Sequence, residues 1–97
     1  MKNIITEYNI HQNHPNPFNP VTTLSYDLPE DGIVNITIYD IVGRQVKALL
    51  NSPQTAGHRS IQWNATNNAG QQVPAGVYLY RIEAGEFRQT KKIVLLK

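Results

Sequence analysis

Residues 13–20 of the chain are Asn13-His14-Pro15-Asn16-Pro17-Phe18-Asn19-Pro20. Each of the three prolines lacks an amide donor, has a fixed φ, and pushes the residue before it towards extended geometry. Asparagine side chains beside proline bond neighbouring backbone groups, which favours turns over a helix or a sheet ladder. The run, called the proline segment below, therefore predicts a rigid, non-helical lead into a domain, with Phe18 as its only large apolar side chain.

After the proline segment, apolar residues recur at every second position, which is typical of half-buried strands. This alternation covers residues 22–28, 33–39, 59–65 and 76–84. Residues 87–96 follow a short turn and are expected to pair with 76–84 as a hairpin. The residues predicted to face the core are Leu24, Tyr26, Leu28, Val34, Ile36, Ile38, Ile61, Trp63, Ala65, Tyr78, Tyr80 and Ile82.

Residues 44–50 have a weaker pattern, which a β-bulge or an edge strand would explain. Trp63 is expected at the centre of the core, because a tryptophan buries about 150–250 Å². Together the segments predict six or seven short antiparallel strands. The fold class is therefore all-β, a single immunoglobulin-like antiparallel β-sandwich, although the Cys-Trp-Cys framework of antibody domains is absent.

The length of 97 residues is that of one domain, and the 40% hydrophobic and 16% charged residues are those of a globular protein. Residues 1–7 lack the apolar stretch of a secretory signal. The longest apolar run has four residues, 93–96, so no membrane insertion is expected. We expect residues 1–12 to be a linker from an upstream cargo domain, or simply the start of a fragment, and residues 13–97 to be the domain.

The charges are unevenly distributed. Residues 1–43 contain one basic and five acidic residues, whereas residues 44–97 contain eight basic and two acidic residues. In a sandwich the two halves pack together, so we expect most of this asymmetry to become cross-strand pairing, with a basic docking face as the alternative. The basic residues match no nucleic-acid-binding pattern, and no nucleic-acid partner is predicted.

No motif in the chain predicts catalysis, a metal site or a cofactor. His11 and His14 are three residues apart, but the prolines exclude the helix that would bring them together and no third ligand lies nearby in sequence. No nucleophile signature or convincing carboxylate pair is present. The oxygen-rich loop at 64–68 contains no carboxylate, so turn formation is preferred over cation binding. The sequence therefore predicts a protein that is not an enzyme.

Five segments in order resemble the C-terminal sorting domains carried by cargo of the type IX secretion system of Bacteroidetes and related bacteria. The resemblance covers about residues 8–97. It rests on the proline segment with residues 22–29, on 39–46, on the Gly57 to Trp63 segment, on the Gly-Val-Tyr strand of 74–80, and on the terminal 91–97. His14 replaces a usual tyrosine, and the asparagines of 64–68 replace a commonly acidic stretch. A related immunoglobulin-like module occurs in flagellar hook-capping proteins.

The resemblance implies a C-terminal sorting signal that directs an attached cargo protein through the type IX outer-membrane translocon, to anchoring at the cell surface or to release. The implied partners are the translocon, a sortase-like protease that removes the domain, and the covalently attached upstream cargo. The implied location is the periplasm in transit, then the outer-membrane surface or the medium. Because Met1 lies close to the domain, the chain is expected to be a fragment without its cargo.

The final hairpin is hypothesised to be what the translocon recognises, because edge strands offer unpaired backbone groups to a partner. The residues assigned to this site are Gly76, Tyr78, Lys91, Lys92, Ile93, Val94, Leu95, Leu96 and Lys97. A simpler interpretation is that Ile93 and Leu95 belong to the core and that the lysines protect the edge. The alternative function is a structural or glycan-binding module, for which Tyr8, Phe18 and Tyr39 would form an exposed aromatic platform.

Overall fold

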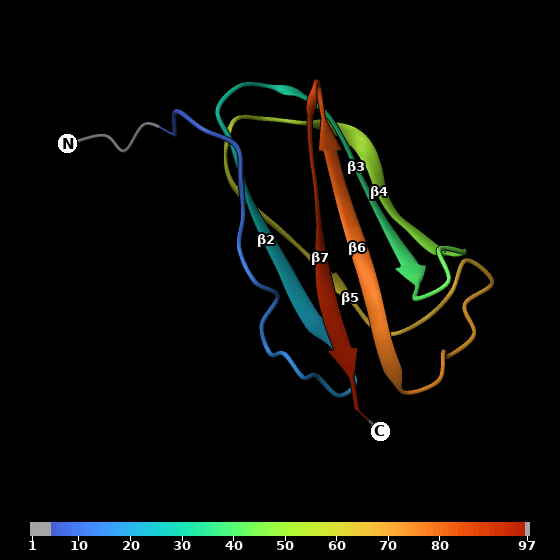
Figure 1. The fold of residues 1–97 in the computed structure, drawn as a ribbon. Coiled ribbons are helices and arrows are strands. Elements are labelled where there is room, and N and C mark those ends of the chain that lie inside the picture. The colour runs from blue at the N-terminus through green and yellow to red at the C-terminus, as the bar shows by residue number, and fades with distance from the viewer. Residues whose placement is uncertain (1–4, 97) are drawn as a thin grey trace.

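The computed structural model describes residues 5–96 as a set of seven β-strands (Figure 1). The strands are β1 (Asn9–Ile10), β2 (Thr22–Leu28), β3 (Gly32–Asp40), β4 (Gln45–Gln54), β5 (Gly57–Trp63), β6 (Gly76–Ala84) and β7 (Phe87–Leu95). Within residues 5–96 the chain forms no helix, so this range contains none that is long and apolar enough to cross a membrane.

The strands form two antiparallel sheets. One sheet has the order β1-β2-β5 and the other the order β4-β3-β6-β7. The predicted hairpin of β6 and β7 is confirmed, with Val77 opposite Val94 and Ala84 opposite Phe87. In Figure 1, β2 lies on the left and β3 and β4 lie on the right, with β6 and β7 between them and β5 passing behind β7 in this view. The prediction of an all-β sandwich is therefore confirmed.

Alternation along each strand produces the core between the sheets. Residues 22–28 are buried at every second position, beginning with Thr22, and so are residues 34–38 and 78–84. Trp63 has no exposed surface, and its ring lies 5.6 Å from that of Phe18 and 5.5 Å from that of Tyr78. Trp63 is therefore at the centre of the core, as predicted, whereas Ile61 is only partly buried at its margin.

The alternation of residues 44–50 is weak because they lie in an edge strand with irregular pairing, as the sequence suggested. Strand β4 is the edge of its sheet, and its pairing with β3 shifts register between Ile36 and Thr37 and again between Ile38 and Tyr39. Each shift reverses which side chains face inward. An edge position also accommodates Pro53 within the strand, since the missing amide is not needed on the open side.

The packed domain extends into the range that the sequence assigned to a linker. In β1, Asn9 pairs with Asp27 and Ile10 with Tyr26. Ile10 is only 5% exposed and belongs to the core. Only two residues of this range are in a strand, too few for alternation to reveal them.

The uneven charge does not become cross-strand pairing, and that expectation was wrong. Within residues 5–96, Asp40 and Arg44 form the only ion pair that joins an acidic residue of the first half to an arginine or lysine of the second. This pair lies within a turn, and the pair of Arg88 with Glu83 lies wholly in the second half. Of the seven described lysines and arginines of the second half, three are exposed (Arg44, Arg88 and Lys92) and the other four are partly buried.

The turn between β3 and β4 is organised by one carboxylate. Asp40 Oδ1 accepts hydrogen bonds from the backbone N–H groups of Val42 (3.1 Å) and Arg44 (2.9 Å), and Oδ2 accepts one from Arg44 Nε at 2.9 Å. Gly43 has φ of 90°, a conformation that side-chain-bearing residues rarely adopt. The backbone hydrogen bond from Arg44, more than any other contact, lowers the pKa of Asp40 below its ordinary value.

We expect Asp40→Asn to destabilise the domain at neutral pH and to have progressively less effect in acid. A carboxylate whose pKa is lower in the folded state stabilises the protein above its unfolded pKa of about 3.9, and this contribution is lost as pH falls through the folded pKa. Urea unfolding of both proteins at pH 7, 5 and 3 would measure this. Glu86→Gln, at the exposed turn between β6 and β7, is the control. A difference between Asp40→Asn and the parent that is constant with pH would contradict the prediction.

Candidate functional site

Part of the predicted recognition site is buried. Ile93 is fully buried and Leu95 is 2% exposed, which agrees with the simpler interpretation of these two residues as core. Tyr78 is also buried, and its hydroxyl donates a 2.6 Å hydrogen bond to the carbonyl of Pro74. In the folded domain a partner therefore has no access to these three side chains. Lys97, assigned to the same site, lies outside the described residues.

The other predicted recognition residues are accessible. Gly76, Lys92 and Leu96 are exposed, and Leu96 leaves 52% of its surface open. Lys91 and Val94 are half-buried. Lys92 and Val94 lie on the outward face of β7, Leu96 follows the strand directly, and Gly76 faces Leu95 at the start of β6. These four residues therefore lie near the C-terminal end of the sheet, whereas Lys91 points to the opposite face of β7.

The proline segment is attached first to the sheet that contains β2. The backbone N–H of His14 donates to Thr23 O at 3.0 Å, and Thr23 N–H donates back to His14 O at 2.9 Å. Asn13 is only 2% exposed, and its Nδ2 donates to Thr22 Oγ1 at 2.9 Å. The Thr22 hydroxyl in turn donates to the carbonyl of Pro15 at 2.8 Å. These buried polar groups are paired, and the turns predicted from Asn-Pro neighbours are thereby fixed.

The same segment also bonds to the last strand of the other sheet. Phe18 N–H donates to Val94 O at 2.9 Å, and Leu96 N–H donates to Phe18 O at 2.8 Å. The side chain of Asn16 adds a third bond, because its Oδ1 accepts from Val94 N–H at 2.9 Å. The proline segment therefore joins β2 to β7 and links the two sheets.

These bonds cover only one half of the edge that β7 presents. In an antiparallel strand the backbone groups of alternate residues turn away from the neighbour, and those of Val94, Lys92, Thr90 and Arg88 turn outward. The carbonyl of Lys92 accepts from Gln12 Nε2 at 3.2 Å. Within residues 5–96, no hydrogen bond is made to the outward groups of Arg88 and Thr90. The N-terminal half of β7 is therefore the part of the edge with unbonded outward groups, and residues 8–12 contact it at both ends, through Tyr8 at Phe87 and Gln12 at Lys92.

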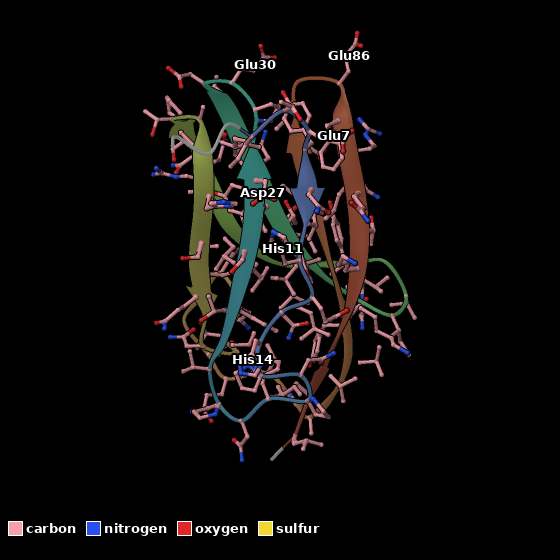
Figure 2. The ribbon with its side chains drawn as sticks, turned by 90° about the vertical axis from the view of Figure 1, so that its left-hand side faces the viewer. Glu7, His11, His14, Asp27, Glu30 and Glu86 are labelled. Atoms are coloured by element: carbon pink, nitrogen blue, oxygen red, sulfur yellow. The ribbon has the colours of Figure 1, made fainter. Side chains whose placement is uncertain are left out.

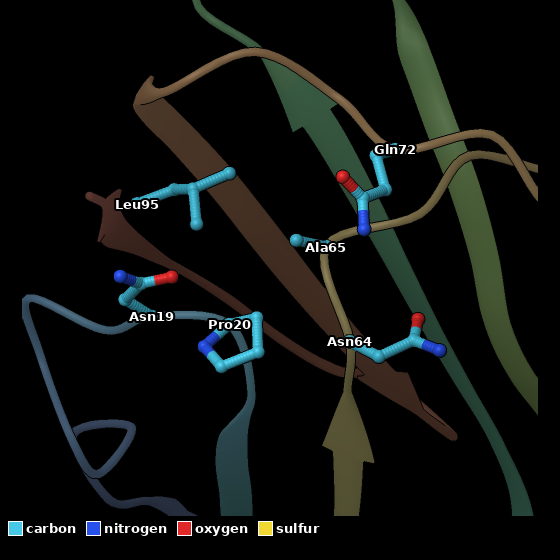
Figure 3. Close-up of a pocket in the computed structure, with 6 residues that line it drawn as sticks. All are labelled: Asn19, Pro20, Asn64, Ala65, Gln72 and Leu95. Atoms are coloured by element: carbon cyan, nitrogen blue, oxygen red, sulfur yellow. The ribbon is translucent and has the colours of Figure 1, made fainter. Parts of the chain in front are cut away.

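The remaining residues of the proline segment lie at the surface. Pro15, Pro17, Asn19 and Pro20 are exposed, and the bonds before all three prolines are cis. Asn19 and Pro20 form one wall of a hollow of about 210 Å³ at this end of the sandwich (Figure 3). Its other walls are Asn64, Ala65, Gln72 and Leu95. Three of these six residues carry side-chain amides, and none carries a charge.

The predicted aromatic platform for glycans does not form. Phe18 is 1% exposed and belongs to the core, so its assignment to an exposed platform was wrong. The ring of Tyr8 is half-buried and stacks on Phe87 at 4.9 Å. Tyr39 lies under the guanidinium of Arg81, which is 5.3 Å from its ring centre. The two remaining rings are thus engaged within the domain and do not form a joint surface with Phe18.

The asparagines of residues 64–68 make turns and strand contacts. Asn67 Oδ1 accepts from two backbone N–H groups of the same loop, each at 3.0 Å. Asn68 Oδ1 accepts from the backbone N–H of Ala48 in β4, at 2.9 Å. Because these oxygens already accept backbone hydrogen bonds, the loop fits the interpretation as turns that the sequence favoured.

Two histidines converge on one carboxylate on the outer face of the β1-β2-β5 sheet. His11 Nε2 lies 3.1 Å from both oxygens of Asp27, and His58 Nδ1 lies 2.6 Å from Asp27 Oδ1. Sequence reasoning paired His11 with His14 and missed this group, because Asp27 and His58 become neighbours only through the register of β2 with β5. In Figure 2, Asp27 and His11 lie close together, whereas His14 lies towards the other end of the sandwich.

The carboxyl group of this cluster is held ionised. Burial of Asp27 raises its pKa, but the hydrogen bonds from His58 and His11 outweigh burial and lower the pKa below its ordinary value. The Asp27 side chain is 12% exposed, whereas those of His11 and His58 are 47% and 72% exposed. A recessed carboxylate therefore lies below two imidazoles that solvent reaches.

The chain matches a known family and several solved structures. The family model for the secretion system C-terminal sorting domain matches residues 12–96. The crystal structure of dimeric latent PorU from Porphyromonas gingivalis aligns with a TM-score of 0.75 and 24% identity, over 92% of this chain and 9% of that one. The structure of FlgD from P. aeruginosa aligns with a TM-score of 0.61 and 19% identity, over 97% of this chain and 74% of that one. No match was found among the curated proteins.

We expect Phe18→Ala to destabilise the domain by about 3–5 kcal/mol, because it removes a buried ring from the centre of a packed core. Chemical denaturation followed by Trp63 fluorescence would measure the loss. The control is Phe87→Ala, which removes the same ring from a half-buried site and should cost clearly less. Equal losses for the two variants would show that the proline segment is not part of the core.

Amide exchange tests the bonds between the proline segment and β7. Val94 N–H points away from β6 but is bonded to Asn16, so it should exchange far more slowly than the outward N–H of Thr90. Asn16→Ala should speed exchange at Val94 selectively, leaving Ile93, which bonds within the sheet, nearly unchanged. Residue-resolved exchange by NMR measures both. Fast exchange at Val94 in the parent protein would contradict the geometry.

Proposed function

The chain belongs to the secretion system C-terminal sorting domain family, and on this premise we propose how it serves as a sorting signal of the type IX secretion system. The observation that carries the assignment is the family match, which spans residues 12–96 and includes both the proline segment and β7. In this proposal the domain directs an attached upstream cargo protein through the outer-membrane translocon, to anchoring at the cell surface or to release.

The finer steps of the route are also part of the proposal. The domain crosses the periplasm attached to its cargo, meets the translocon, and is then cut off by a sortase-like protease. It is a substrate and a binding partner in these steps and has no catalytic role of its own. We propose that the linker to the cargo ends just before Tyr8, since Tyr8 stacks on Phe87 and Ile10 is in the core.

Recognition is assigned to the accessible residues of the final hairpin. Lys92 on β7 presents a cation, and Leu96, directly after the strand, presents an apolar side chain. Towards the other end of β7, the outward backbone groups of Arg88 and Thr90 make no hydrogen bond within residues 5–96, and a strand of the translocon would pair with them. Because the proline segment occupies the remainder of the edge, a partner strand would have one defined place to add.

The test fuses the chain to a reporter with a periplasmic export signal, in a host with a working type IX system. Lys92→Glu and Leu96→Asp should each lower the secreted fraction at least about fivefold, the effect of removing a contact worth 1 kcal/mol or more. Deleting the last five residues would be ambiguous, because it removes Ile93 and Leu95 from the core.

Gln62→Glu is the matched control, since Gln62 is exposed on β5 in the other sheet and the change also adds a negative charge. All variants should keep the melting temperature of the parent to within a few degrees. Normal secretion of both hairpin variants would overturn the assignment of recognition to these hairpin residues. Failure of the parent fusion to leave the periplasm would overturn the sorting function itself.

A further inference from the structure

Three separate strands or strand ends place metal-binding side chains together. Asp27 lies on β2, the central strand of its sheet, and His58 lies directly opposite it on β5. His11 follows β1 on the other side of β2, and its backbone N–H bonds to Ser25 O at 3.0 Å. Its carbonyl accepts from the hydroxyl of Tyr80 at 3.0 Å, so the backbone at His11 is fixed from two directions.

We infer that His11, Asp27 and His58 bind a divalent first-row transition-metal ion, for which Zn²⁺ is the physiological candidate. One donor atom from each residue, two imidazole nitrogens and a carboxylate oxygen, lies within 4.8 Å of the other two. Two histidines and one carboxylate form a ligand set that suits such ions and is less suited to Mg²⁺ or Ca²⁺, which prefer oxygen. The family assignment and the proposed sorting role do not require this site.

The geometry needs only small adjustments to hold the ion. Zn²⁺ binds nitrogen at about 2.0–2.1 Å and carboxylate oxygen at about 2.0–2.2 Å, so ligand atoms of a tetrahedral site lie about 3.3 Å apart. Asp27 is already 2.6 and 3.1 Å from the two imidazole nitrogens. The two rings are 47% and 72% exposed and are therefore free to turn, while the carboxylate stays fixed in the sheet.

Binding exchanges hydrogen bonds for metal bonds. In the metal-free cluster a ring N–H directed at Asp27 donates a hydrogen bond, whereas a metal ligand must present a lone pair from the same nitrogen. The proton moves to the other ring nitrogen, Nδ1 of His11 or Nε2 of His58, or is lost to solvent if the ring was cationic. Three protein ligands leave one tetrahedral position for water.

Titration of the untagged chain with ZnCl₂ near pH 7.5, followed by calorimetry, tests the site. We expect one Zn²⁺ per chain, a rise in melting temperature on Zn²⁺ addition, and reversal of the rise by EDTA. MgCl₂ should give neither effect. We expect each ligand variant to weaken Zn²⁺ binding by at least about tenfold: Asp27→Asn, His11→Gln and His58→Gln. Changing a residue that only supports a metal ligand already weakens metal binding by about tenfold or more, and loss of a ligand should cost no less.

His14→Gln is the matched control, because His14 is an exposed histidine outside the cluster. It should bind Zn²⁺ like the parent. Melting curves without metal show whether each variant is folded. His11 and His58 are exposed, so His11→Gln and His58→Gln are expected to disturb folding least. Absence of Zn²⁺ binding in the parent, or equal binding in all four variants, would overturn the site and leave only a hydrogen-bonded ion cluster.

Discussion

The hydrogen bonds between the proline segment and β7 are the constraint on which the rest of the domain depends. A final strand with one open edge would leave donors and acceptors of Val94 and Leu96 unpaired, and Asn16 and Phe18 pair with them. The same segment bonds to β2 through His14 and Thr23. One short, stiff stretch of chain therefore ties the two sheets together at the C-terminal end of β7.

The aromatic core makes this attachment cooperative. Phe18 and Tyr78 both contact Trp63, so the proline segment, β5 and β6 share one packed group of rings. Removing any of the three parts leaves the other two facing a void. Phe18 donates its N–H to Val94 O and accepts from Leu96 N–H through its carbonyl, while β7 pairs with β6, so the positions of Lys92 and Leu96 depend on the whole sandwich. The exposed end of the final hairpin therefore has its observed arrangement only in the folded domain.

Local patterns in the sequence predicted the strands, but not how distant segments meet. Alternation at 22–28 and 34–38 determined which faces are buried, and the turn at Gly85-Glu86 predicted the final hairpin. The sequence identified Phe18 as the apolar residue of the proline segment, yet it did not reveal that Phe18 pairs with β7. The His11, Asp27 and His58 cluster was missed for the same reason. Its spacing follows no short motif, since it depends on the register of β2 with β5 and on the course of the chain after β1.

The bond from Val94 to Asn16 joins residues 78 positions apart in the sequence. Closing so long a loop costs conformational entropy before any contact compensates for it. For this reason β-folds dominated by distant pairings fold in milliseconds to seconds, whereas helical bundles fold in microseconds to milliseconds. On a ribosome, β7 is also the last strand of the domain to emerge. The contacts between the proline segment and β7 are therefore among the last that can form, because they need residues from both ends of the domain.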